Sequence, residues 1–196
     1  MVMKLFDIFD VTDVKVEDPG LRHYIGLDAK FVPRSRGRNR GRFDRAKTNI
    51  IERFMGLLAV PGHRGKKHRI IMRCTGKYEK EAKAVIDALK IIEKKLNLNP
   101  IQVFVKAIEN SSPRDEVTAI EYGGARYPQA VDVSPTRRLG IALRNLVHGS
   151  QDKCFRKKTK LAEAIAAEII AAYQNSADSH AVMKRNEAEK QADGAR

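Results

Sequence analysis

The sequence predicts a mainly α-helical protein, a six-helix bundle with a protruding β-hairpin between the third and fourth helices and a basic N-terminal extension. In six segments apolar residues recur every three or four positions, which is the spacing of one helix face. Residues 117–133 are instead rich in β-branched and aromatic residues around Gly123-Gly124, which is typical of a hairpin. With 196 residues, 42% of them hydrophobic, we expect one helical domain over residues 46–196 after an extended segment over residues 1–45.

The first two helices are separated by basic residues. The first helix should begin near Lys47 and end at Pro61-Gly62, because proline and glycine interrupt helices. Residues 63–69, HRGKKHR, then form a basic loop. The apolar stripe from Tyr78 to Leu96 predicts a second helix of about five turns.

The third helix has a clear start signal. Asn99 suits the N-cap, Pro100 suits the first helical position, and Gln102 completes a pattern like a capping box. Residues 110–113, NSSP, should end this helix. In the hairpin that follows, Pro128 lacks an amide hydrogen and suits an edge strand. A lone two-stranded ribbon is marginally stable, so we expect it to lean on the helices or on a partner.

The last three helices follow from the same spacing. Ser134-Pro135 should open the fourth helix and Gly149 should close it. Residues 161–173 predict a strongly periodic fifth helix, and residues 178–194 predict a sixth whose apolar side is mostly alanine. The sixth helix has little to bury, so its end at residues 192–196 should fray.

Positive charge is concentrated in two segments of the chain. Residues 34–69 carry nine arginines and three lysines against two carboxylates, so their net charge is +10 of the total +14. Residues 137–160 add +7, and the remaining segments are close to neutral. So dense a charge repels itself within a fold, and we expect it to bind a polyanion, with nucleic acid as the first candidate.

Several other classes of protein are not supported by the sequence. No apolar run approaches the roughly 20 residues that span a bilayer, and the N-terminus lacks the features of a signal peptide, so we expect a cytosolic protein. Cys74 and Cys154 are isolated and should be reduced thiols. His63, His68 and Cys74 match no common zinc spacing, and no catalytic motif occurs, so we expect no metal, no cofactor and no enzymatic activity.

Basic side chains for phosphates and exposed aromatic rings for unpaired bases are the usual means of binding RNA. Phe43, Tyr122 and Tyr127 are candidates for stacking, although cross-strand packing explains the two tyrosines at least as well. The predicted RNA-binding residues lie in or beside the basic segments and the hairpin. They are Arg34, Arg36, Arg38, Arg40, Arg42, Arg45, Arg64, Lys66, Lys67, Arg69, Lys77, Arg114, Arg126, Arg137, Arg138, Arg144, Lys157 and Lys158.

Residues 99–144, which contain GGARYP followed by VDVSPTRR, closely resemble the universal small-subunit ribosomal protein seven family in its archaeal and eukaryotic form. The resemblance extends upstream through NIIERF and TGKYEKEA and downstream through LAEAIAAEIIAAYQN, about three quarters of the chain. Tyr78 departs from the family, which usually has a second lysine after Gly76-Lys77.

The resemblance implies a structural protein that binds small-subunit ribosomal RNA directly and nucleates assembly of the subunit head. It also implies a position near the exit site, where the ribbon, with Arg126 at its tip, and the C-terminal helix approach messenger RNA and exit-site transfer RNA. Its other partners would be neighbouring small-subunit head proteins, and its location the cytoplasmic ribosome.

Three alternatives remain open from the residues. A non-ribosomal RNA or DNA binder would share the charge but should bind isolated duplexes about as well as ribosomal RNA. An enzyme that acts on nucleic acid would need a metal or an acid–base pair in a cleft. A basic membrane-surface protein would need an apolar face, which the arginine-rich segment lacks.

Overall fold

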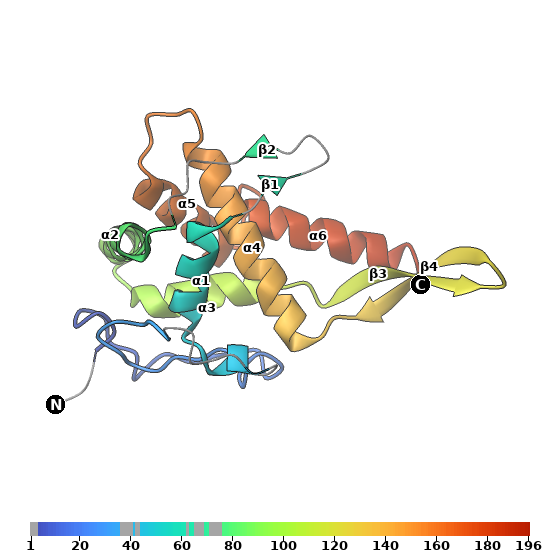
Figure 1. Cartoon of the computed structure of the whole chain (residues 1–196), viewed down its shortest axis with the longest axis horizontal. Helices are drawn as coiled ribbons and strands as arrows, with labels where there is room; N and C mark the ends of the chain where they lie inside the picture. The colour runs from blue at the N-terminus through green and yellow to red at the C-terminus, as the bar shows by residue number, and fades with distance from the viewer. Residues whose placement is uncertain (1–3, 36–40, 42–43, 62, 65–68, 71–75) are drawn as a thin grey trace.

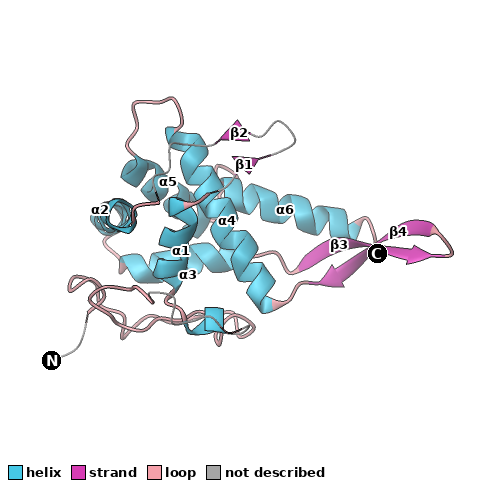
Figure 2. Cartoon of the chain, in the orientation of Figure 1, coloured by secondary structure: helices cyan, strands magenta, loops and turns pink. Residues whose placement is uncertain are grey.

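The computed structural model describes residues 4–35, 41, 44–61, 63–64, 69–70 and 76–196. Within these residues the chain forms six α-helices and a long antiparallel ribbon between the third and fourth, which confirms the mainly α prediction (Figures 1 and 2). The helices are α1 Ile50–Ala59, α2 Tyr78–Leu96, α3 Pro100–Ser111, α4 Pro135–Cys154, α5 Leu161–Tyr173 and α6 His180–Asp193. The ribbon is β3 Asp115–Tyr122 with β4 Ala125–Asp132, and smaller elements are the 3₁₀ helix η1 Asp44–Lys47 and the two-residue strands β1 His63–Arg64 and β2 Arg69–Ile70.

Helix α3 lies at the centre of the bundle and packs against α2, α4, α5 and α6. Its apolar residues are buried among these helices, and its polar face, with Gln102, Lys106 and Glu109, contacts the N-terminal segment. The Phe104 ring meets Phe54 of α1 edge to face, with centroids 5.2 Å apart and planes at 64°. One continuous core therefore joins the helices.

Asparagine residues start α1 and α3. The Oδ1 atoms of Asn49 and Asn99 accept hydrogen bonds from the amides of Ile51 and Ile101, at 2.9 and 3.0 Å. The predicted cap at Asn99 is confirmed, but the capping role of Gln102 is wrong. Its side-chain amide instead accepts from the Lys15 N–H at 2.8 Å and donates to the Lys15 carbonyl at 3.0 Å, which holds the N-terminal segment against α3.

The prediction that Gly149 ends α4 is wrong, because the helix continues to Cys154. A Cβ atom at Gly149 would lie 2.5 Å from the carboxyl carbon of Glu168 on α5. Glu168 is fully buried; it accepts hydrogen bonds from the Ser179 hydroxyl and the Ala181 amide and pairs with Lys153 at 2.7 Å. The glycine therefore allows the close approach of α5, and the carboxylate joins α4, α5 and the start of α6.

Residues 4–35 contain no helix or strand but wrap along one side of the bundle (Figure 1). Leu5, Phe9, Leu21 and Ile25 are buried in the same core as the helices. The sequence did not indicate this packing, because two pairs at a spacing of four, 12 residues apart, are too few to form a helical stripe.

The ribbon extends away from the bundle (Figure 1). Its register runs from Asp115 opposite Asp132 to Tyr122 opposite Ala125, and Gly123 and Gly124 form the turn with φ of 58° and 81°. The base of β3 packs against α6. Helix α6 ends at Asp193, and two contacts oppose the expected fraying of the C-terminal residues: Ala192 is buried, and Arg196 pairs with Asp115 at 2.5 Å.

Candidate nucleic-acid interface

Part of the predicted RNA-binding set lies outside the described residues. Arg36, Arg38, Arg40, Arg42, Lys66 and Lys67 belong to this group, as does Phe43. For three further residues only the backbone is described: Arg45 lies in η1, and Arg64 of β1 is paired with Arg69 of β2. The predicted basic loop over residues 63–69 thus begins and ends as a short antiparallel pair.

At the start of the arginine-rich segment, Arg34 is held against α2. Its guanidinium carbon lies 5.0 Å from the centroid of the Tyr78 ring, and the side chain stays exposed. Stacking uses the face of the guanidinium, so its in-plane N–H groups remain free to donate. Lys77 is exposed at the N-cap of α2, beside Tyr78.

Neighbouring arginines at the start of α4 lie in different environments. Arg137 is exposed and donates two hydrogen bonds to the Glu116 carboxylate, from Nε at 2.6 Å and from Nη2 at 2.8 Å. This pair lowers the pKa of Glu116 and raises that of Arg137. Arg138 is only 8% exposed, and its Nη2 atom pairs with Asp18 at 2.6 Å. Arg138 therefore joins α4 to the N-terminal segment and does not present its charge to solvent.

The environment of Asp18 reflects this ion pair. Burial raises the pKa of Asp18, but the hydrogen bonds from Arg138 and from the Gly20 amide together lower it by more than burial raises it. The pKa of Asp18 therefore lies below its usual value. The Arg138 Nε atom is buried without a hydrogen-bond partner in the described part of the chain. Spacing alone could not separate Arg138 from Arg137, because the partner of Arg138 lies 120 residues away.

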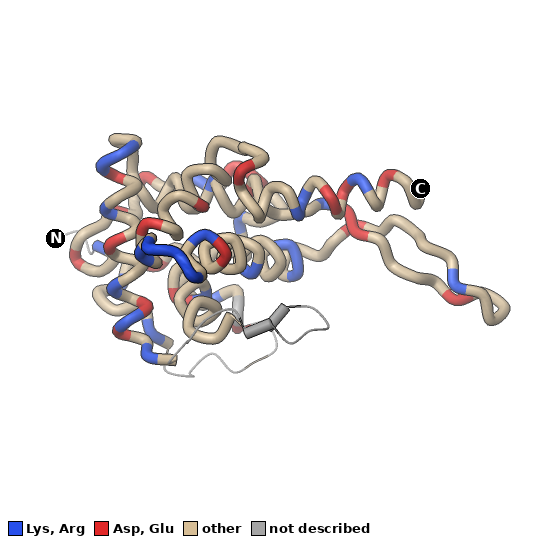
Figure 3. The backbone as a smooth tube through the Cα atoms, turned by 90° about the horizontal axis from the view of Figure 1, so that it is seen from above, with Lys and Arg blue, Asp and Glu red and all other residues tan. Residues whose placement is uncertain are grey.

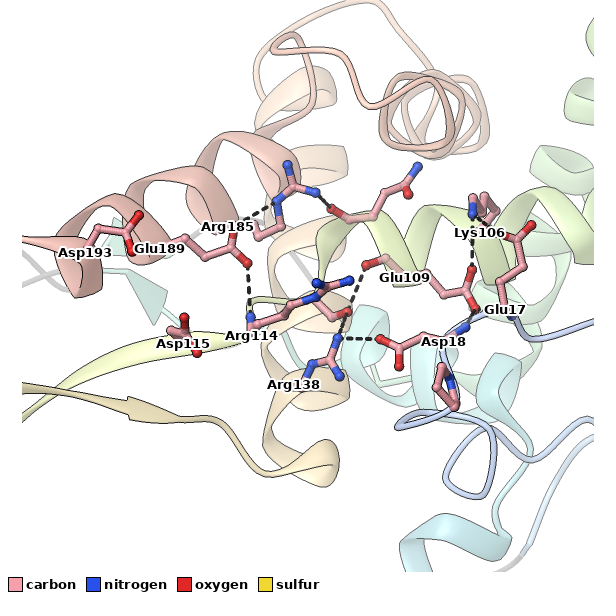
Figure 4. Close-up of a pocket in the computed structure, with 13 residues that line it drawn as sticks. Glu17, Asp18, Lys106, Glu109, Arg114, Asp115, Arg138, Arg185, Glu189 and Asp193 are labelled. Carbon is pink, nitrogen blue, oxygen red and sulfur yellow. Dashed lines mark hydrogen bonds and ion pairs between the residues drawn. The ribbon is translucent and has the colours of Figure 1, made fainter. Parts of the chain in front are cut away.

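A cavity of about 670 Å³ surrounds this ion pair, between the N-terminal segment, α3, α4, α6 and the base of β3 (Figure 4). Its lining holds six carboxylates and four cations, Lys106, Arg114, Arg138 and Arg185, so its own charge does not favour phosphate. Each of the carboxylates lies within ion-pair distance of a lysine or arginine. We therefore interpret the cavity as a structural ion-pair network.

The ribbon presents different residues on its two faces. Tyr122 and Tyr127 are 81% and 60% exposed, and they share one face with Ile120. Arg126 lies on the opposite face, where it pairs with Glu121 at 3.6 Å. Basic and acidic residues are interspersed over the helices (Figure 3), whereas the sequences of β3 and β4 contain no lysine or arginine besides Arg126.

The remaining predicted cations are exposed. Arg144 lies midway along α4, Lys157 and Lys158 follow the end of that helix, and Arg114 precedes β3. Within the described residues, no carboxylate pairs with Arg144, Lys157 or Lys158. Arg156 was not among the predicted residues, yet it is exposed, with its guanidinium 5.2 Å from the Phe155 ring centroid. Its place in the basic segment 137–160 was the signal that could have identified it.

The described part of the chain holds neither a cluster that could bind a metal nor a helix that could span a membrane. No three His, Cys, Asp or Glu side chains there converge to hold a metal ion, although His68 and Cys74 lie outside that part. None of the described helices is long and apolar enough to cross a membrane. The arrangement is thus a helical body with exposed cations near the beginning of α2, along α4 and after α4.

The chain is similar, along most of its length, to proteins of one family. The model of the family described as ribosomal protein S7p/S5e matches residues 22–196. The chain is 50% identical over 198 residues to the small ribosomal subunit protein uS7 of Nanoarchaeum equitans, covering all of both chains. It is 43% identical over 200 residues to the protein of the same name from Methanococcus aeolicus, again covering all of both. For the Archaeoglobus fulgidus relative the identity is 41% over 193 residues, which is 98% of this chain and 94% of that one.

Proposed function

The chain belongs to the family of ribosomal protein S7p/S5e, in its archaeal form, and from this premise we propose that it is a structural protein of the small ribosomal subunit that binds small-subunit ribosomal RNA directly. It would act in the ribosome of the cytoplasm, without enzymatic activity. The relatives named above carry the small ribosomal subunit in their names, and the match includes the helical body and the ribbon.

One observation supports RNA binding above all others: within the segment 34–69 the sequence supplies only two carboxylates, Asp44 and Glu52, for twelve lysines and arginines. In the segment 34–69, which has a net charge of +10, the Asp44 carboxylate accepts from the Lys47 ammonium and the Gly41 amide, and Glu52 accepts from the Ser35 amide. Two carboxylates cannot neutralise twelve cations. Phosphates of folded RNA would supply the missing negative charge, and release of their condensed ions would drive much of the affinity.

The helical body holds several other exposed cations at fixed positions. Arg34 and Lys77 lie near the start of α2, Arg144 lies on α4, and Lys157 and Lys158 lie beyond its end. These groups, together with the cations of residues 36–45 and 64–69, would contact phosphates on more than one strand of a folded RNA. We exclude Arg138 from the proposed contacts because its charge is buried against Asp18.

The finer proposal concerns assembly and translation. We propose that binding nucleates assembly of the subunit head, beside neighbouring head proteins, and that the ribbon and α6 lie near the exit site, where they contact messenger and transfer RNA. The projection of the ribbon beyond the bundle and the exposed rings of Tyr122 and Tyr127 support this placement.

The test is binding of purified protein to a small-subunit RNA fragment that contains the head domain, measured by filter binding with competitors. An RNA duplex and a DNA duplex of equal total charge serve as competitors. We expect the head-domain fragment to be preferred by at least about 100-fold, because a folded RNA matches the fixed cations whereas a duplex meets only part of them. Equal competition by the duplexes would favour a general nucleic-acid binder and contradict the proposal.

A further inference from the structure

Two helices hold the start of the arginine-rich segment. The Tyr78 hydroxyl of α2 donates to the Pro33 carbonyl at 3.0 Å, across 45 residues of sequence. The Glu52 carboxylate of α1 accepts from the Ser35 amide at 2.5 Å. Between these contacts, the Arg34 guanidinium lies over the Tyr78 ring, 5.0 Å from its centroid. Three successive residues are thus fixed to the body of the protein.

The local backbone agrees with this attachment. Pro33 is buried, and the Arg34 amide donates to the Val32 carbonyl at 2.8 Å, so the chain turns tightly before the arginines begin. Glu52 lies in the first turn of α1, where a negative charge is favoured by the helix dipole. Both helices would be stable without these contacts, because α1 and α2 bury their own apolar faces in the core.

We infer that Tyr78 and Glu52 are positioning residues that hold Pro33, Arg34 and Ser35 on the helical body, so that the arginine-rich segment meets RNA from a fixed starting point. The inference rests on the proposed RNA binding and deepens it. A chain attached before binding loses less conformational entropy when it meets RNA, and affinity rises accordingly. The tyrosine acts through Arg34 and the backbone and carries no charge itself.

The contribution of charge can be separated from that of attachment by substituting lysine at two sites. Tyr78→Lys adds a cation but removes both the hydroxyl and the ring. Leu98→Lys adds the same charge at a residue that follows α2 and is 47% exposed. If charge alone matters, both variants bind head-domain RNA at least as tightly as the wild type. If Tyr78 positions the segment, Tyr78→Lys binds more weakly, by about two- to tenfold, despite its added charge.

Tyr78→Phe keeps the ring over Arg34 and removes only the hydrogen bond to Pro33. We expect a smaller loss of affinity, an unchanged slope of log Kd against log salt, and an unchanged Tm. The slope should persist because the same cations still reach phosphates, whereas a variant that merely unfolds would lose helical circular dichroism. Wild-type affinity in Tyr78→Phe, together with Tyr78→Lys as tight as Leu98→Lys, would overturn the inference.

Amide hydrogen exchange without RNA tests the attachment separately. The Ser35 amide should exchange slowly in the wild type and faster in Glu52→Ala, whereas Glu52→Gln, which keeps an acceptor oxygen, should stay close to the wild type. If the Ser35 amide exchanges equally fast in Glu52→Ala and in the wild type, the attachment is contradicted, whatever the measured affinity for RNA. Failure of the wild type to bind head-domain RNA would instead contradict the proposed function and leave the exchange result standing.

Discussion

Asp18→Asn should destabilise the fold, because it removes the charged partner of the buried Arg138. The two side chains are 20% and 10% exposed and their atoms are 2.6 Å apart. Breaking a fully buried ion pair costs about 3–5 kcal/mol. Because this pair retains some exposure to solvent, we expect the free energy of unfolding to fall by about 2–3 kcal/mol. For a chain of this length that loss lowers Tm by about 4–12 °C.

The assay is thermal and urea unfolding followed by circular dichroism at pH 7. The control is Asp28→Asn, which lies in the same N-terminal segment and removes a surface pair with Lys30, whose side chains are 63% and 49% exposed. Such pairs contribute about 0–1 kcal/mol, so the control should differ little from wild type. An Asp18→Asn variant as stable as Asp28→Asn would refute the stabilising role of the ion pair.

The same ion pair predicts a dependence on pH. The pKa of Asp18 is lower in the folded state than its ordinary value of 3.8, so its stabilising contribution is present above that value. It is lost as the pH falls below 3.8 and through the folded pKa. The stability difference between wild type and Asp18→Asn should thus be constant near neutrality and shrink in acid. A difference that does not shrink as the pH falls below 3.8 would contradict this linkage.

Three further predictions concern other sites. Burial raises the pKa of Glu81, so ionisation of this carboxyl lowers the stability of the fold as the pH rises above 4.5. Glu81→Gln should therefore raise Tm at pH 7 but not at pH 4, and an equal effect at both pH values would contradict this cause. Gly149→Ala should lower the free energy of unfolding, measured by urea titration, by about 1–3 kcal/mol, because the new Cβ would lie 2.5 Å from the Glu168 carboxyl. The control Gly140→Ala, whose Cβ would meet nothing within 4 Å, should not show this loss, and equal losses in both variants would contradict the reasoning. Arg126→Glu should leave the circular dichroism melt unchanged but impair RNA binding or exit-site function, and wild-type behaviour in both assays would remove the ribbon from the interface.

Features that depend on neighbouring residues were predictable from the sequence. The apolar period located the six helices, and Asn99 and Pro100 marked the start of α3 because a cap is satisfied within its own turn. Gly123 and Gly124 located the ribbon, since its turn needs positive φ at both positions.

Features that depend on distant partners were not predictable. In the sequence Gly149 is typical of a helix end, and only the folded structure shows that Glu168 of another helix lies against it. In the same way, the spacing of Gln102 from Asn99 is typical of a capping residue, and only the folded structure shows that Gln102 bonds to Lys15 instead. Within the candidate interface, Arg137 and Arg138 are equivalent in sequence, and only the folded N-terminal segment brings Asp18 to one of them.

The salt dependence of binding to head-domain ribosomal RNA tests most directly whether the exposed cations of this protein contact phosphates. If the uncompensated cations meet phosphates, log Kd should rise linearly and steeply with log salt, with a slope that reports several phosphate contacts. A variant with Arg144, Lys157 and Lys158 changed to Gln should show a shallower slope, by about two to three contacts. A flat salt response, or the same slope in both proteins, would contradict the account.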